Sequence, residues 1–174
     1  MASNKPVFTI SNLYETKILQ SKVTIKPHEM NVLDINNLLL KKLISKIGKY
    51  CISDGIVNTD TIEILSHSLG EMYNFDTSGT IHYIIKYSAD VCKPKQGQIL
   101  KCIVDEHTDT QTICYIGDES SSPLEIYLNK QNYIGNREYA TLKKGDTVIV
   151  RVVICNVDIA HDKIATIGEF LQKA

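Results

Sequence analysis

The sequence has no tryptophan, four prolines and nine glycines in 174 residues. It has no apolar run near the roughly 18 residues that cross a bilayer, and no apolar stretch follows Lys5 to form a secretory signal. It also has no Asn-x-Ser/Thr glycosylation site. With 43% hydrophobic and 22% charged residues, the composition excludes a fibrous or fully disordered chain. These features predict a soluble intracellular protein of one large or two small domains.

An excess of charge of either sign is also missing. The 19 basic residues oppose 20 acidic ones, which gives a formal net charge of −1, and each half of the chain is close to neutral by itself. Nucleic-acid modules that bind mainly by neutralising phosphates carry a basic excess, so neither half belongs to that class. Seventeen of the 19 basic residues are lysine, and together with abundant isoleucine and asparagine this indicates an AT-rich coding genome.

The five cysteines form no Cys-x-x-Cys pair, and their odd number argues against a disulfide framework. Most lie within apolar runs, so we expect reduced, buried thiols that act as small hydrophobic side chains. Cys102, His107 and Cys114 are an alternative set of metal ligands. They lack a fourth ligand and a tight Cys-x2-4-Cys knuckle, which makes a poor zinc site. We therefore predict neither a metal nor another cofactor.

No catalytic constellation is present in the sequence. Residues 143–147 contain a Gly and a Thr after two lysines but lack the spacing of a phosphate-binding loop. The histidines form no His-Glu-x-x-His pair and lie near no Gly-x-Ser-x-Gly elbow. The acidic pairs Asp105-Glu106 and Asp118-Glu119 fall in turns between predicted strands, where solvated charge is the expected role. We predict that the chain is not an enzyme.

The first half predicts an α+β unit over residues 1–92. Apolar residues recur at steps of three and four from Val32 to Ile47, as in an amphipathic helix of about five turns, and Gly48 follows as a left-handed cap. Strands are expected within 7–25, in short pieces at 50–52, 55–57 and 61–65, and along 80–91. In the last of these, Ile81, Tyr83 and Ile85 share one face.

The second half, residues 93–174, predicts an all-β barrel. The sequence Lys93-Pro94-Lys95-Gln96-Gly97 breaks the chain, and no helical period follows it except at the very end. Five β segments are expected at 98–104, 110–116, 124–128, 147–155 and 163–168. A long connection separates the third from the fourth, which is the layout of a five-stranded OB barrel.

Two motifs and their spacing resemble a known family. Gly97-Gln98-Ile99 and Gly145-Asp146-Thr147, whose glycines are 48 residues apart, resemble the opening and the fourth strand of S1-type RNA-binding barrels. Residues 83–91 followed by Lys93-Pro94-x-x-Gly97 resemble the junction in stalk subunits of archaeal and eukaryotic RNA polymerases, the seventh-subunit family. Gly48-Lys49-Tyr50 and residues 165–168 fit the same pattern. The resemblance covers residues 7–172, and its divergence favours a large DNA virus over a fast-evolving eukaryote as the source.

The resemblance implies a non-catalytic stalk subunit of a multisubunit DNA-directed RNA polymerase. Its tip domain (1–92) would dock beside the largest and the small sixth subunits, with a helical fourth subunit as a further partner. Such a subunit would reside in viral replication sites of the host cytoplasm and in the virion, or in the nucleus if cellular. The implied docking residues lie in one polar loop with apolar anchors: Leu69, Gly70, Met72, Tyr73 and Phe75. The alternative is a loop folded back on its own strands.

The resemblance also implies weak binding of single-stranded RNA by the S1 barrel. Tyr115 and Tyr127 would stack on bases, and the flanking cations would be Lys101, Lys130 and Arg151. The acidic loop 118–122 departs from the family pattern and weakens this expectation. The two tyrosines could instead pack against the tip or fill the end of the barrel. Rival functions are a freestanding S1-type RNA-binding protein in translation or RNA decay, which the near-zero net charge disfavours, and an OB inhibitor that binds protein.

Overall fold

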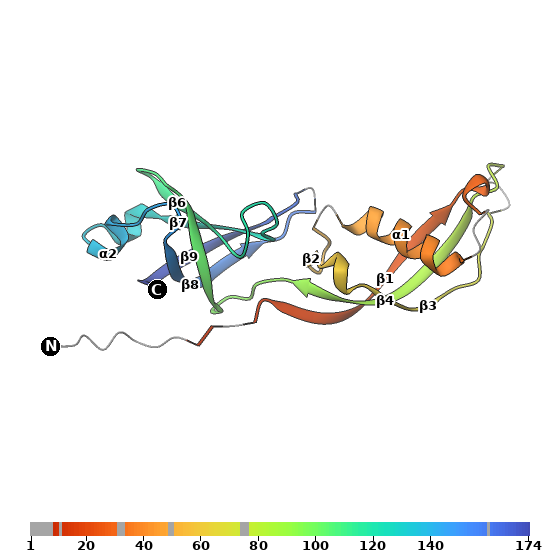
Figure 1. Cartoon of the computed structure of the whole chain (residues 1–174), viewed down its shortest axis with the longest axis horizontal. Coiled ribbons are helices and arrows are strands. Elements are labelled where there is room, and N and C mark those ends of the chain that lie inside the picture. The colour runs from red at the N-terminus through yellow and green to blue at the C-terminus, as the bar shows by residue number, and fades with distance from the viewer. Residues whose placement is uncertain (1–8, 11, 31–33, 49–50, 74–76, 160) are drawn as a thin grey trace.

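The computed structural model describes residues 9–10, 12–30, 34–48, 51–73, 77–159 and 161–174. A sheet with one helix comes first and a closed five-stranded barrel follows, end to end with it (Figure 1). This arrangement confirms the predicted fold class of an α+β unit followed by an all-β barrel.

The first unit, called here the N-terminal sheet, is organised around one long central strand, with which the other three strands pair. Strand β1 (Tyr14–Ile25) pairs antiparallel with β4 (Ile81–Cys92) along its whole length. The opposite edge of β4 pairs with β2 (Ile56–Val57) and β3 (Glu63–His67). Alternate residues of β4 are buried from Tyr83 to Val91, as the period of two in the sequence predicted.

Helix α1 (Ile35–Ile47) covers one face of this sheet, and its predicted apolar stripe is buried at Leu39, Leu43 and Ile47 (Figure 1). The helix begins where the Asp34 carboxylate accepts hydrogen bonds from two backbone N–H groups of the first turn. Val32, the predicted start of the stripe, lies outside the described residues. One-turn 3-10 helices stand before and after α1, at Pro27–Glu29 and Thr59–Thr61.

The sequence predicted a left-handed conformation for Gly48, and this prediction is wrong. Gly48 caps α1 in the right-handed region, with φ −75°, and its N–H donates to Ile44 O. A glycine is still needed there because an added Cβ would lie 2.7 Å from Ile44 O and 2.9 Å from Thr59 Cγ2. The close approach of Ile44 O in α1 and of the Thr59 side chain, rather than backbone handedness, therefore explains this residue.

The barrel closes in the order β5-β6-β7-β9-β8. Only β7 and β9 pair in parallel, and the other four pairings are antiparallel. The strands are β5 (Ile99–His107), β6 (Gln111–Tyr115), β7 (Leu124–Asn129), β8 (Thr147–Asn156) and β9 (Ile164–Lys173).

Three details of the barrel differ from the sequence prediction. Strand β5 extends to His107, so Asp105 and Glu106 lie in a strand rather than in the predicted turn. Strand β9 continues five residues beyond position 168 to Lys173, so the end of the chain is a strand and not a helix. The connection between β7 and β8 contains a 3-10 turn, Lys130–Tyr133, and the short helix α2 (Arg137–Ala140). Four helical residues make about one turn, which is too short to show a helical period in the sequence.

The two motif glycines have a shared structural role. Gly97 and Gly145 have φ of +86° and +88°, a region that glycine occupies without a steric penalty. Each lies just before a barrel strand and donates its N–H to a neighbouring strand, Gly97 to Val152 O and Gly145 to Val104 O, both at 2.8 Å. The motif therefore marks the points at which β5 and β8 enter the barrel.

The N-terminal sheet and the barrel are joined by an apolar contact as well as by the chain. Cys51 and Cys92 are buried in the same cluster as the barrel core, and the Cys51 N–H donates to His161 O at 2.9 Å. Burial, with the charges of neighbouring thiols, raises the pKa of Cys92 to about 12. All five cysteines are free and four are buried, as the apolar runs around them predicted.

Candidate docking and nucleic-acid surfaces

The predicted docking loop continues β3 along the edge of β4. Ser68 N–H donates to Ile84 O at 2.9 Å, and Glu71 pairs with His82 through two backbone hydrogen bonds. Gly70 lies between these two points. A larger residue would not fit there, because an added Cβ would lie 2.6 Å from Ile81 Cγ2 and 2.8 Å from the Tyr83 hydroxyl oxygen. The backbone of this segment is thus held against its own sheet.

The apolar side chains of the same segment remain outside this packing. Leu69 is 88% exposed and Met72 is 64% exposed, whereas Tyr73 is partly covered. Phe75, the remaining predicted docking residue, lies outside the described residues. Adjacent apolar side chains at the end of a sheet, held by a fixed backbone, have the properties of anchor residues in a protein interface.

Tyr73 lies on the ring of His82. The ring centroids are 4.4 Å apart with an interplanar angle of 31°. The Lys22 ammonium group donates to the Tyr73 hydroxyl at 2.6 Å. Neither Lys22 nor His82 was predicted from the sequence as part of the docking site. Their positions 60 residues apart in the chain give no local signal, and they come together through the pairing of β1 with β4.

Tyr115 and Tyr127 lie on the outward side of the barrel rather than in its core. Tyr115 pairs with Ile103 on β5, and Tyr127 pairs with Ile113 on β6. Both tyrosines are partly buried. Burial raises the pKa of Tyr127 to about 12, and a hydrogen bond and the charge of Glu125 act in the same direction. Its hydroxyl therefore stays protonated and remains a hydrogen-bond donor at neutral pH.

The predicted cations are not gathered around these tyrosines. The Lys130 ammonium group lies 3.4 Å from an Asp109 carboxylate oxygen, and an Arg151 guanidinium nitrogen lies 3.0 Å from Glu169. Arg151 is on β8, between β5 and β9, whereas Lys130 follows β7. Lys101 is exposed on β5. Two of the three cations are thus neutralised by carboxylates on the protein itself.

A groove of about 410 Å³ lies beside Tyr127, and no local sequence pattern predicts it. Its lining combines aromatic, aliphatic, hydroxyl and side-chain amide groups from β6 and the turn before it, from β7 and the turn after it, and from β9: Thr110, Gln111, Tyr127, Asn129, Gln131, Asn132 and Ile167. Side-chain amides both donate and accept hydrogen bonds, as the edges of nucleobases do. The groove therefore offers one aromatic ring and several side-chain amides to a ligand.

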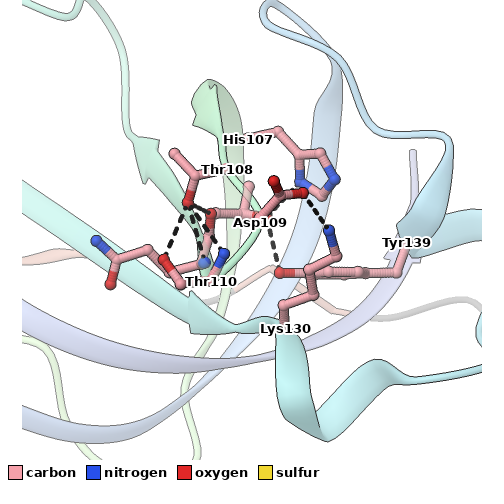
Figure 2. Close-up of polar contacts among 8 residues, drawn as sticks. His107, Thr108, Asp109, Thr110, Lys130 and Tyr139 are labelled. Carbon is pink, nitrogen blue, oxygen red and sulfur yellow. Dashed lines mark hydrogen bonds and ion pairs between the residues drawn. The ribbon is translucent and has the colours of Figure 1, made fainter.

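A series of hydrogen bonds links His107, Thr112 and Tyr139 at one end of the barrel, where Figure 2 shows His107 and Tyr139. The Tyr139 hydroxyl donates to Leu128 O at 3.1 Å, so it accepts from the Thr112 hydroxyl, 2.7 Å away. Thr112 then has no second proton and accepts from His107 Nδ1, also at 2.7 Å. Figure 2 shows Lys130 reaching Asp109 across the same end of the barrel. These hydrogen bonds connect α2 to the end of the barrel. They give His107 a structural role that needs no metal.

Cys102 and Cys114, the other two candidate metal ligands, are buried in the barrel core. Within the described part of the chain, no group of three or more His, Cys, Asp or Glu side chains could hold a metal ion. None of the helices in the described ranges has the length and apolar character needed to cross a membrane.

Comparison with known proteins supports the family resemblance. No family model matches the sequence. Over 170 residues the chain is 25% identical to a protein of Acanthamoeba polyphaga mimivirus named "Putative DNA-directed RNA polymerase subunit". The similarity covers 94% of this chain and 84% of that protein. The relative is viral, and its name agrees with the resemblance to a divergent RNA polymerase subunit drawn from the motifs.

Proposed function

We propose that the chain is a non-catalytic subunit of a viral DNA-directed RNA polymerase. The observation that carries this proposal is similarity along nearly the whole chain to a viral protein with that name. Because the similarity runs through both the N-terminal sheet and the barrel, it concerns the complete arrangement rather than one common domain. The order of sheet and barrel also agrees with the stalk-subunit resemblance.

Within such a polymerase, the chain would occupy the stalk position. The N-terminal part, residues 1–92, would dock on the polymerase core near its largest and small sixth subunits. The exposed side chains of Leu69 and Met72, at the free end of the N-terminal sheet, support this orientation. The barrel, residues 93–174, would then project away from the core toward emerging RNA. A helical fourth subunit would be a further partner.

RNA contact would use the groove beside Tyr127 and remain weak. Stacking on one aromatic contributes about 1–3 kcal/mol per base, and the side-chain amides add hydrogen bonds. The ion pairs of Lys130 and Arg151 leave little positive charge for phosphates. A subunit held beside the transcript by a large complex can function with such affinity, whereas a freestanding RNA-binding protein depends more on the electrostatic term.

The test is native affinity purification of the tagged protein from its own source, with quantitative mass spectrometry. We expect the two largest polymerase subunits in about equal molar amounts with the bait. A photo-crosslinker at position 72 should then label the core, and one at position 127 should label RNA. Recovery of the bait alone, or with ribosomes, would refute the polymerase proposal and favour the freestanding RNA-binding function.

A further inference from the structure

His82 is a partly buried residue with unusual polar atoms. Both of its ring nitrogens are removed from solvent, and neither has a hydrogen-bond partner among the residues that the structure describes. A neutral imidazole carries one donor and one acceptor nitrogen. Leaving such groups buried and unbonded is unfavourable, because the hydrogen bonds to water are lost on folding and nothing replaces them.

The fold does not require a histidine at this position. The backbone of residue 82 supplies both hydrogen bonds to Glu71, and Thr24 is its neighbour in β1. These contacts are independent of the side chain. A phenylalanine would stack on Tyr73 equally well without any buried nitrogen. The unfavourable choice of residue therefore points to a function, as local conflicts with folding rules commonly do.

The surroundings of His82 indicate what would bind there. Tyr73 lies on the imidazole ring, and its hydroxyl accepts from the ammonium group of Lys22. Lys22 and His82 both contact Tyr73, so a group that replaced Tyr73 would meet a cation and an imidazole ring. Glu71, the cross-strand neighbour of His82, leaves both ring nitrogens unbonded. The exposed Leu69 and Met72 lie on the same segment as Tyr73.

We propose that His82 is a concealed recognition group for an acidic side chain of the docking partner. The partner is a protein loop that carries an Asp or Glu beside apolar residues. Its carboxylate displaces Tyr73 and binds both His82 and Lys22, while its apolar residues cover Leu69 and Met72. This inference rests on the proposed docking of the N-terminal sheet and adds the chemistry of the surface that it meets.

The test compares variants of the full chain in binding to polymerase core that lacks this subunit. His82→Phe keeps the ring stack but loses the donor, and we expect about tenfold weaker binding or more, as for a hydrogen bond to a charged group. Lys22→Met should weaken binding similarly. Because one carboxylate bridges both residues, the double variant should lose much less than the product of the single losses. His161→Phe, on an exposed barrel loop, is the matched control and should bind normally.

The thermal stability of the free protein gives a second, independent measurement. His82→Phe should raise its Tm by about 3 °C or more, because two unbonded buried nitrogens disappear. An unchanged or lower Tm would overturn the proposal. Normal core binding by His82→Phe, with binding lost in Met72→Asp, would also overturn it and leave the docking function intact. Failure of the wild-type protein to bind core would overturn both.

Discussion

The N-terminal sheet and the barrel bury their apolar residues in different ways. The barrel has no free edge, and its inward side chains, such as Leu100, Ile126 and Leu128, are at most 2% exposed. The N-terminal sheet is covered by α1 on one face only. Its other face leaves Ile18 62% exposed and Ile84 46% exposed. The barrel therefore satisfies its own packing, whereas the N-terminal sheet has apolar surface available for a partner.

The free edge of the N-terminal sheet is protected in part. Strand β1 pairs only with β4, so its outer edge has unpaired backbone groups among the described residues. The Lys46 ammonium group, at the end of α1, donates to Lys22 O on that edge at 2.7 Å. Lysine at an edge opposes unwanted strand pairing. Association through side chains of the open face is thus favoured over association through the edge.

The largest expected difference between the two regions is the loss of stability when a leucine side chain is shortened to alanine. We expect Leu128→Ala to lower the free energy of unfolding by about 2–5 kcal/mol, because it leaves a cavity in a closed barrel. Leu69→Ala, an identical change at an exposed position, should stay within about 0.5 kcal/mol of the wild type. Urea unfolding followed by circular dichroism measures both. A similar loss in the two variants would contradict the division between packed barrel and open sheet.

A charge introduced at the docking end should weaken binding to the polymerase core and leave the stability of the free protein unchanged. Met72→Asp should reduce binding to the polymerase core by about a hundredfold or more, equivalent to about 2.7 kcal/mol, as loss of an interface anchor does. Its Tm should not change, since Met72 is 64% exposed in the free protein. Binding by surface plasmon resonance and melting by calorimetry test these expectations. Val153→Asp, at an exposed site on β8, is the control for charge alone.

Removal of one aromatic should sharpen the assignment of the barrel. Tyr127→Ala should weaken binding of a fluorescent single-stranded RNA by about 1–3 kcal/mol, the contribution of one stacked base. Arg151→Ala should have little effect because its guanidinium already pairs with Glu169. Fluorescence anisotropy across a salt series should give a shallow slope, since few phosphates are contacted. A steep slope, or a larger loss in Arg151→Ala, would place the RNA elsewhere.

The smallest expected effect is a loss of folding stability at low pH, and it involves one ion pair in each region. A hydrogen bond from Lys42 lowers the pKa of Glu29 in the N-terminal sheet, and one from Lys173 lowers the pKa of Asp146 in the barrel. Their ordinary values are 4.5 and 3.8. Because the folded pKa lies below the unfolded one, each pair stabilises the fold above its ordinary value and loses this contribution as the pH falls through the folded pKa.

Both regions should therefore lose a little stability below about pH 4.5, and no extra loss is expected between pH 5 and 7 from these groups. Urea midpoints of the wild type, Glu29→Gln and Asp146→Asn at pH 7 and pH 3 measure the effect. Each variant should show a smaller drop between the two pH values than the wild type. An equal drop in all three proteins would assign acid sensitivity to other groups.

Periodicity made most of the fold predictable from the sequence. The stripe of α1 and the alternation of β4 and of the barrel strands appear directly in the order of residues. Short or close-packed features were not predictable in this way. A four-residue helix shows no period, and the Thr59 side chain that approaches Gly48 comes from a later segment.

The candidate surfaces were only partly predictable. The sequence predicts Leu69, Met72 and Tyr127 as binding residues, and the structure shows that Leu69 and Met72 are exposed. It could not show that Lys130 and Arg151 are paired with carboxylates, because Asp109 and Glu169 are distant in sequence. The groove beside Tyr127 likewise combines residues of β6, β7, β9 and a following turn.

Local sequence patterns are enough to predict an α+β unit followed by an all-β barrel, because hydrophobic periods and turn glycines act locally along the chain. Which polar groups meet depends instead on the folded arrangement of distant segments. The pairing of β1 with β4 brings Lys22 to the Tyr73 hydroxyl, and the fold of the 71–73 segment places Tyr73 over His82. Such contacts depend on strand register, in which a shift of one residue would turn each side chain to the opposite face.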